Sequence, residues 1–129
     1  MKTEEKQIDS GIRIFTDGSG CRPDGKGSGF AWFREDTGAK KITREDGLTN
    51  NQAEYRAIIS ALQSLSSQSK AEILTDSENT CYQLKGDRRV RDPKLAELHD
   101  QIQALIEKNQ LSVTFTWIPR RDNKAGRLI

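Results

Sequence analysis

Two short segments of this sequence end in the same way. Residues 14–17 (IFTD) and residues 73–76 (ILTD) each hold an apolar run that should be buried and that stops at an aspartate. If the two runs form neighbouring parallel strands, both carboxylates emerge at the same carboxyl edge of a sheet, where open α/β sheets bind ligands. One such aspartate is usually the N-cap of a turn or helix. The occurrence of two, Asp17 and Asp76, favours a functional site.

A third carboxylate, Glu54, lies near the start of a segment with helical periodicity. It precedes Ile58 and Leu62 at helical spacing, which places it on or beside the apolar face of the first turn. The ordinary alternative is a glutamate stabilised there by the helix dipole. If Glu54 instead points over the sheet edge, three carboxylates gather in one place, and a cation is needed to neutralise them. Carboxylate oxygens with open positions favour Mg²⁺ or Mn²⁺.

The hydrophobic pattern predicts the elements that must position these three side chains. Thr49 is the expected N-cap of the helix that carries Glu54, and Gln52 completes a capping box. Strands are predicted over residues 12–17, 28–34, 39–46, 71–76 and 111–117. Helices are predicted over about four turns from Asn50, over residues 77–84, from Pro93, and in a stub over residues 122–129.

This order of elements predicts an α/β fold with a mixed five-stranded sheet. Three antiparallel hairpin strands come first, and two strands reached through helices then run parallel to the first strand. Helices flank the sheet. We expect residues 11–129 to form a single domain and residues 1–10 to be a flexible polar leader.

The composition argues against several other classes of protein. Of the 129 residues, 33% are hydrophobic and 31% are charged, and no apolar run approaches the roughly 20 residues of a membrane span. The polar N-terminal residues lack the apolar segment of a secretory signal. One histidine and two cysteines, Cys21 and Cys81, are too few for a zinc cluster, a disulfide framework or a Ser-His-Asp triad. We therefore predict a cytoplasmic monomer without membrane contact, and we leave a pairing of the two cysteines open.

Basic side chains are concentrated in two places, although the net charge is only +2. Residues 85–94 hold five Lys or Arg against two Asp, and the tail from Ile118 holds four against one. These segments are either solvated surface or contacts for a polyanion. Trp32 and Trp117 lie on predicted strands and are expected to be core residues rather than platforms for base stacking. His99 lies on a helical apolar stripe and is expected to be structural.

Three motifs resemble a known family. Residues 15–19 (FTDGS), 49–54 (TNNQAE) and 74–77 (LTDS) resemble, in order and spacing, the anchor motifs of type 1 ribonuclease H. The resemblance covers the chain from about Ile12 to its end. It implies a ribonuclease H-like fold and endonucleolytic hydrolysis of the RNA strand of an RNA–DNA hybrid, leaving 5′-phosphate and 3′-OH ends.

The resemblance also implies roles for individual residues. Asp17 would bridge two Mg²⁺ (or Mn²⁺) ions, Glu54 would complete one metal site, and Asp76 would ligate a metal and order the attacking water. Substrate contacts are implied, including the contact to the RNA 2′-OH that distinguishes RNA from DNA, at Gly18, Ser19, Asn50, Asn51 and Gln52. The basic protrusion of some relatives is absent, so this is a short variant, and Arg88 and Arg89 are expected to hold phosphates of the DNA strand.

The end of the chain departs from the family pattern. Relatives carry a fourth carboxylate on the last helix, in a pattern such as Asn-x-x-Ala-Asp, whereas residues 122–129 read DNKAGRLI. Counting from Asn123 places Arg127 at the fourth carboxylate's position, and counting back from Leu128 places Gly126 there. Asn123, through its amide oxygen, is the favoured replacement, with Asp122 as the alternative. An uncharged ligand should weaken metal binding and shift the preference towards Mn²⁺.

Two other functions remain open at this point. A hybrid-binding module whose catalysis has decayed would explain the missing carboxylate, although the three intact carboxylates argue against it. Another nuclease of the same fold, such as a resolvase or a 3′ exonuclease, is the second alternative. Such exonucleases place Asp-x-Glu on the first strand, whereas Asp17 is followed here by Gly18 and Ser19.

Overall fold

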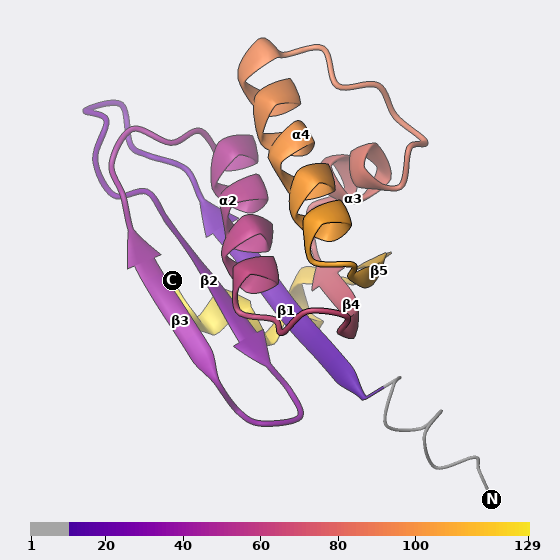
Figure 1. Cartoon of the computed structure of the whole chain (residues 1–129). Coiled ribbons are helices and arrows are strands. Elements are labelled where there is room, and N and C mark those ends of the chain that lie inside the picture. The colour runs from indigo at the N-terminus through magenta and orange to yellow at the C-terminus, as the bar shows by residue number, and fades with distance from the viewer. Residues whose placement is uncertain (1–10) are drawn as a thin grey trace, which may run out of the picture.

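A computed structural model describes residues 11–129 of the chain (Figure 1), so the leader predicted over residues 1–10 lies outside the described residues. Five strands form one mixed sheet in the order β3-β2-β1-β4-β5. The strands are β1 (Ile12–Ser19), β2 (Gly29–Arg34), β3 (Lys40–Arg44), β4 (Lys70–Thr75) and β5 (Ser112–Trp117). β2 is antiparallel to β1 and to β3, whereas β4 is parallel to β1 and to β5. The predicted sheet, including its strand directions, is confirmed.

The helices begin close to where the sequence predicts them. They are α2 (Asn50–Gln63), α3 (Glu78–Leu84) and α4 (Pro93–Lys108). The predicted capping box at the start of α2 is present: the Thr49 hydroxyl accepts from the Gln52 amide at 3.1 Å, and Gln52 Oε1 accepts from the Thr49 amide at 3.0 Å. The predicted C-terminal stub is instead two short 3₁₀ turns, η1 (Arg120–Asp122) and η2 (Lys124–Leu128).

The main core lies between one face of the sheet and the helices. Ile14 of β1 and Ile73 of β4 are fully buried there, together with Ile58 of α2 and Ile102 of α4. None of the helices within residues 11–129 has the length and apolar character needed to cross a membrane.

The C-terminal turns cover part of the opposite face of the sheet, where the yellow segment passes behind the strands in Figure 1. Ala125 of η2 is fully buried against Phe15 of β1 and Leu74 of β4. The last residues of the chain therefore pack beneath the same two strands that end in the candidate aspartates.

One of the two tryptophans is not in the core. Trp32 is buried as predicted, but Trp117 is 44% exposed because β5 is one of the two edge strands of the sheet. The indole N–H of Trp117 donates to the backbone carbonyl of Asp76 at 3.2 Å. The prediction that Trp117 is a core residue is therefore wrong. Cys21 and Cys81 are both free thiols.

Two glycines allow α2 to approach β1 closely. A Cβ atom at Gly18 would lie 2.3 Å from the backbone carbon of Ala53, and one at Gly20 would lie 2.5 Å from the backbone nitrogen of Asn50. Both distances are below any real carbon contact, so side chains are excluded at these positions. The amide of Gly20 also donates to Asn50 Oδ1 at 2.7 Å. The first turn of α2 is thereby held directly over the end of β1.

Candidate active site

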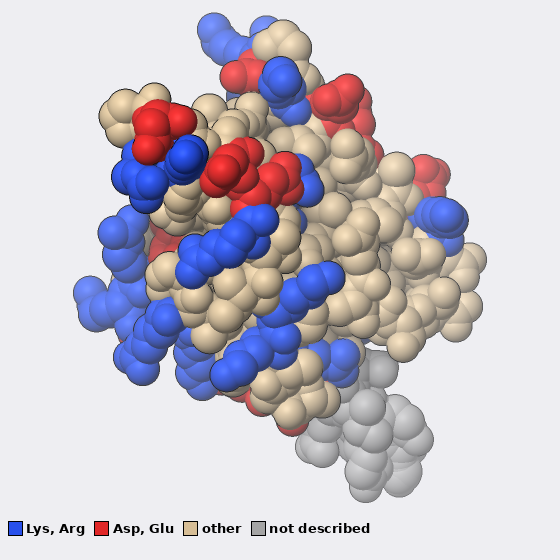
Figure 2. Space-filling view, turned by 90° about the vertical axis from the view of Figure 1, so that its left-hand side faces the viewer, with Lys and Arg blue, Asp and Glu red and all other residues tan. Residues whose placement is uncertain are grey.

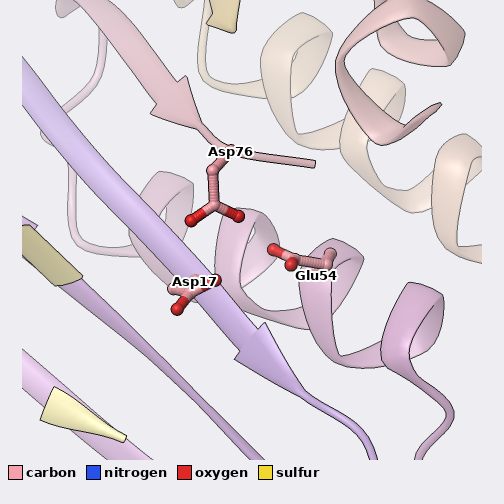
Figure 3. A group of neighbouring side chains, drawn as sticks. All are labelled: Asp17, Glu54 and Asp76. Carbon is pink, nitrogen blue, oxygen red and sulfur yellow. The ribbon is translucent and has the colours of Figure 1, made fainter. Parts of the chain in front are cut away.

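The three carboxylates predicted to gather lie together at one edge of the sheet (Figure 3). Asp17 comes from β1, Glu54 from the start of α2, and Asp76 from the segment that follows β4. One carboxylate oxygen of each residue lies within 4.8 Å of the others. We call Asp17, Glu54 and Asp76 the carboxylate cluster.

The register of the sheet explains why the two aspartates are neighbours. Thr16 and Thr75 are partners in the parallel pairing of β1 with β4, and both are fully buried. Each aspartate directly follows its threonine in the sequence, so the two carboxylates emerge side by side. Glu54 reaches them from above because Gly18 lets α2 contact the backbone of β1.

Burial and mutual repulsion raise the pKa of two members of the cluster. Burial, with the negative charge of Asp76, raises the pKa of Asp17 to about 6, and the Arg120 guanidinium opposes part of that rise. Burial, with the charges of Asp17 and Asp76, raises the pKa of Glu54 to about 9. Without a cation, Glu54 therefore holds a proton at neutral pH.

The donor set fits a divalent cation. Glu54 is only 8% exposed, and its Oε1 atom has no hydrogen-bond partner within residues 11–129. A buried polar atom without a partner is costly and calls for an explanation. All three donors are carboxylate oxygens, which are ligands that Mg²⁺ and Mn²⁺ prefer. A bound ion would give Glu54 Oε1 a partner and neutralise the charge of the cluster.

The cluster lies in a cleft of about 720 Å³. Four of the predicted substrate-contact residues line it, namely Gly18, Ser19, Asn50 and Asn51. Further lining residues not assigned a role from the sequence motifs are Ser77, Arg120 and Arg121. Three arginines that line the cleft, Arg120, Arg121 and Arg127, belong to the basic tail that begins at Ile118. The concentration of positive charge in this tail is the sequence feature that could have identified them.

Three predicted substrate-contact residues lie outside the lining of this cleft. The Gln52 side chain is engaged in the cap of α2. Arg88 lies beyond α3, with its guanidinium carbon 5.1 Å from the centre of the Tyr82 ring and an N–H donated to Asn79 at 3.4 Å. Arg89 is exposed in the same connection.

Comparison with known proteins identifies the family. The family model for RNase H matches residues 9–125. The chain belongs to the RNase H family. Curated relatives include the bifunctional protein Rv2228c of Mycobacterium tuberculosis, 36% identical over 83 residues, and YpeP of Bacillus subtilis, 36% identical over 80 residues. These matches cover 62% and 59% of this chain but only 22% and 35% of the relatives' lengths.

Solved RNase H structures share the fold over nearly the whole chain. The N-terminal RNase H domain of Rv2228c is 30% identical with a TM-score of 0.76, covering 91% of this chain and 88% of that one. LC11-RNase H1 in complex with an RNA/DNA hybrid is 29% identical with a TM-score of 0.78, covering 88% of each chain. RNase H1 of Halobacterium salinarum is 26% identical with a TM-score of 0.78, covering 91% and 92%.

In this RNase H chain, Asn123 is oriented differently from the sequence-based expectation. Its side-chain nitrogen donates to the Thr16 carbonyl at 2.9 Å and to Asp76 Oδ2 at 3.2 Å. Its side-chain oxygen accepts from the Ala125 amide at 3.0 Å. We expected the amide oxygen to face a metal, but the amide nitrogen faces the cluster. The alternative, Asp122, is exposed and does not line the cleft.

Gly126 lies beside Asp17, and a side chain at position 126 would point towards the Asp17 carboxylate. A Cβ atom built at Gly126 would lie 3.2 Å from Asp17 Oδ2, and Gly126 lines the cleft. The sequence offered two positions for the fourth carboxylate of the family, Arg127 and Gly126. The structure shows that Gly126 is the one that faces the cluster. This RNase H chain has a glycine at the point where a fourth side chain would meet the carboxylates.

Proposed function

We propose that this chain is an endonuclease that hydrolyses the RNA strand of RNA–DNA hybrids, leaving 5′-phosphate and 3′-OH ends. The observation that carries the proposal is the carboxylate cluster, with its three oxygens within 4.8 Å at the carboxyl edge of an RNase H sheet. The likeness to LC11-RNase H1, solved with an RNA/DNA hybrid, supports the same class of substrate.

Asp17, Glu54 and Asp76 would hold two Mg²⁺ or Mn²⁺ ions. When bound, such a pair activates a water and stabilises the leaving oxygen of an in-line displacement. The chain supplies the rigid frame for this chemistry, because two paired strands and a capped helix fix the three carboxylates. The proton on Glu54, whose pKa is raised to about 9, must leave before its carboxylate becomes a ligand.

The cleft suits a nucleic acid strand. Asn50 and Asn51 in the first turn of α2 present amides that could hydrogen-bond a 2′-hydroxyl, which is the group that distinguishes RNA from DNA. Arg120, Arg121 and Arg127 also line the cleft and bring positive charge to it, which would attract phosphates.

A second group of side chains is suited to the DNA strand. Two cations lie close to the Tyr82 ring, with Lys85 Nζ 5.4 Å and the Arg88 guanidinium carbon 5.1 Å from its centre. Asn79 accepts from Arg88 in the same group. We call Asn79, Tyr82, Lys85 and Arg88 the basic–aromatic cluster. Its charges are exposed, so they remain available for phosphates.

Cleavage of a labelled RNA–DNA hybrid tests the proposal, with single-stranded RNA and duplex DNA as control substrates, in Mg²⁺ and separately in Mn²⁺. We expect cleavage of the hybrid alone, with 5′-phosphate product ends. Asp17→Ala should abolish it without unfolding the protein, because the change relieves repulsion in the cluster. Asp100→Ala, an exposed change on α4, is the matched control and should leave cleavage unchanged. Full activity of Asp17→Ala would contradict the proposal.

A hybrid-binding module without catalysis is the second candidate, favoured by the glycine at position 126. It predicts that the hybrid binds while neither metal supports cleavage. Binding measured by fluorescence anisotropy beside the cleavage assay separates the two functions.

We also propose a monomer located in the cytoplasm. Both cysteines are free thiols, as expected in a reducing compartment, where disulfides are rare. Light scattering on the purified protein tests the monomer, since a mass well above 14.5 kDa would contradict it.

A further inference from the structure

Asn123 connects three parts of the molecule through one buried side chain. Only 3% of it is exposed. Its amide group reaches the backbone of β1 at Thr16, the carboxylate of Asp76, and the backbone of η2 at Ala125. The contact to Thr16 joins residues that are 107 positions apart.

The chemistry of the partners fixes which way the amide points. The Thr16 carbonyl can only accept a hydrogen bond, and the Ala125 amide can only donate one. The Asn123 oxygen must therefore face Ala125, and its nitrogen must face Thr16 and Asp76. Turning the group by half a rotation would place two acceptors against each other at Thr16 and two donors against each other at Ala125.

We propose that Asn123 is a positioning residue that holds Asp76 through an N–H donor, and that it is not a metal ligand. The inference rests on the proposed metal-dependent function. Asp76 Oδ2 receives the Asn123 hydrogen bond, whereas Oδ1 receives no donor from residues 11–129. Asn123 therefore fixes one oxygen of the carboxylate and leaves the other for a cation.

The same side chain also sets the backbone next to Asp17. By accepting from Ala125, Asn123 caps η2 at its first turn. The next residue, Gly126, passes so close to Asp17 that a Cβ there would lie 3.2 Å from its Oδ2 atom. Loss of Asn123 should therefore disturb both aspartates of the carboxylate cluster, although it touches only one.

The hydrogen exchange of the Ala125 amide tests the orientation directly in the unaltered protein. If Asn123 positions Asp76, its oxygen stays on Ala125 and this amide remains protected from exchange with and without Mg²⁺. If Asn123 is a ligand, its oxygen must leave Ala125 to reach the metal. Loss of Ala125 protection on adding Mg²⁺ would overturn the inference.

Substitutions test the consequence for metal binding. Groups that orient metal ligands typically contribute about 10–100-fold to metal affinity or activity. We expect Asn123→Ala to bind Mn²⁺ at least about 10-fold more weakly by calorimetry, and to lower kcat for the hybrid while KM changes little, because the amide is only 3% exposed and bonds to other groups of the protein. Asn109→Ala, at the C-cap of α4, is the matched control and should change neither.

Asn123→Asp separates the two roles of the side chain. Aspartate has the same shape and keeps an oxygen for Ala125, but it cannot donate to Thr16 or Asp76. The added negative charge attracts a cation in either case, so the rate of cleavage separates the two roles. A positioning role predicts a lower kcat than in the unaltered protein, because Asp76 loses its N–H donor, whereas a ligand role predicts an unchanged or higher kcat. An unchanged or higher kcat in Asn123→Asp, or unchanged binding and kcat in Asn123→Ala, would overturn the inference. If either variant fails to fold by circular dichroism, the exchange of Ala125 decides.

The binding and exchange measurements use no nucleic acid, so they are independent of cleavage. A protein that binds Mn²⁺ but cleaves no hybrid contradicts the proposed function, while the role of Asn123 is still decided by the calorimetry and the exchange. A protein that binds no divalent ion contradicts both.

Discussion

At the scale of single residues, the carboxylate cluster determines how this protein responds to pH and to metal. Glu54 is the most buried of the three carboxylates, and its pKa is raised further than that of Asp17. Its protonation relieves repulsion from Asp17 and Asp76 when no cation is present. A proton and a metal ion therefore compete for the same oxygen atoms.

This competition predicts a pH dependence of stability in the metal-free protein. The pKa of Glu54 is raised from 4.5 to about 9, so its stabilising contribution is complete below pH 4.5 and is lost as the pH rises towards 9. The pKa of Asp17 is raised from 3.8 to about 6, so Asp17 adds to this loss of stability between pH 3.8 and pH 6. In a chelator, the melting temperature of the unaltered protein should fall relative to that of Glu54→Gln between pH 5 and pH 9. Equal pH profiles for the two proteins would contradict the prediction.

Gly126 allows a second prediction at this scale. Gly126→Asp would place a carboxylate beside Asp17, because the Cβ position lies 3.2 Å from Asp17 Oδ2. We expect a lower melting temperature in a chelator and a larger stabilisation by Mn²⁺ than in the unaltered protein, since a cation neutralises the added charge. Gly126→Asn, with the same shape and no charge, should show the smaller metal effect. Thermal unfolding at several Mn²⁺ concentrations measures both.

At the scale of elements, the site depends on contact between α2 and β1. The contact is possible because Gly18 has no side chain. A side chain at position 18 would hold α2, and with it Glu54, away from the ends of the strands. The two aspartates at the sheet edge would then lack the third carboxylate.

Gly18→Ala should therefore damage both stability and activity. The added methyl group would meet backbone atoms of Ala53 at 2.3 Å and 2.5 Å, which cannot move unless the whole helix moves. We expect destabilisation by roughly 3 kcal/mol or more, in the range of severe core overpacking. Denaturant unfolding measures it. Ser19→Ala, at the exposed neighbouring position, is the control and should change stability little.

Much of this arrangement could be predicted from the sequence, because apolar periodicity reports which face of each element is buried. Strand directions followed from the connections, and Asp17, Glu54 and Asp76 followed from their places at the ends of elements. The capping role of Gln52 followed from its spacing to Thr49. The orientation of Asn123 could not be assigned in this way, because the partners of its polar side chain are set by a backbone turn that no hydrophobic pattern encodes.

Gly18 and Trp117 required tertiary information of another kind. The atoms that exclude a side chain at Gly18 belong to residues 53 and 54, which are remote in sequence. Trp117 has the alternation of a buried strand, but its exposure depends on β5 being the last strand of the sheet.

At the scale of the whole molecule, charge is distributed unevenly despite a net charge of only +2. Figure 2 shows Lys and Arg side chains spread over the face seen from the side of β3. β3 itself contributes three exposed basic residues, Lys40, Lys41 and Arg44. These charges lie on the opposite edge of the sheet from β5. They provide a natural control for the role of the basic–aromatic cluster.

Salt dependence distinguishes these two groups of charges. Each phosphate contact adds about one unit to the slope of log affinity against log salt concentration. The double variant Lys85→Ala with Arg88→Ala, which removes both charges of the basic–aromatic cluster, should make the slope for hybrid binding shallower by about one to two units. Lys40→Ala with Lys41→Ala removes the same net charge and should leave the slope nearly unchanged. Equal effects of the two pairs would show that only total charge matters.

The hydrogen bond between Asn123 and Thr16 also has a consequence for biosynthesis. It joins β1 to a turn made 107 residues later. A nascent chain that has extended just past β4 to Asp76 already contains all three carboxylates, but the hydrogen bond from Asn123 to Asp76 has not yet formed. During translation the chain is close to messenger RNA, and its nuclease site is completed only after the C-terminal turns have left the ribosome.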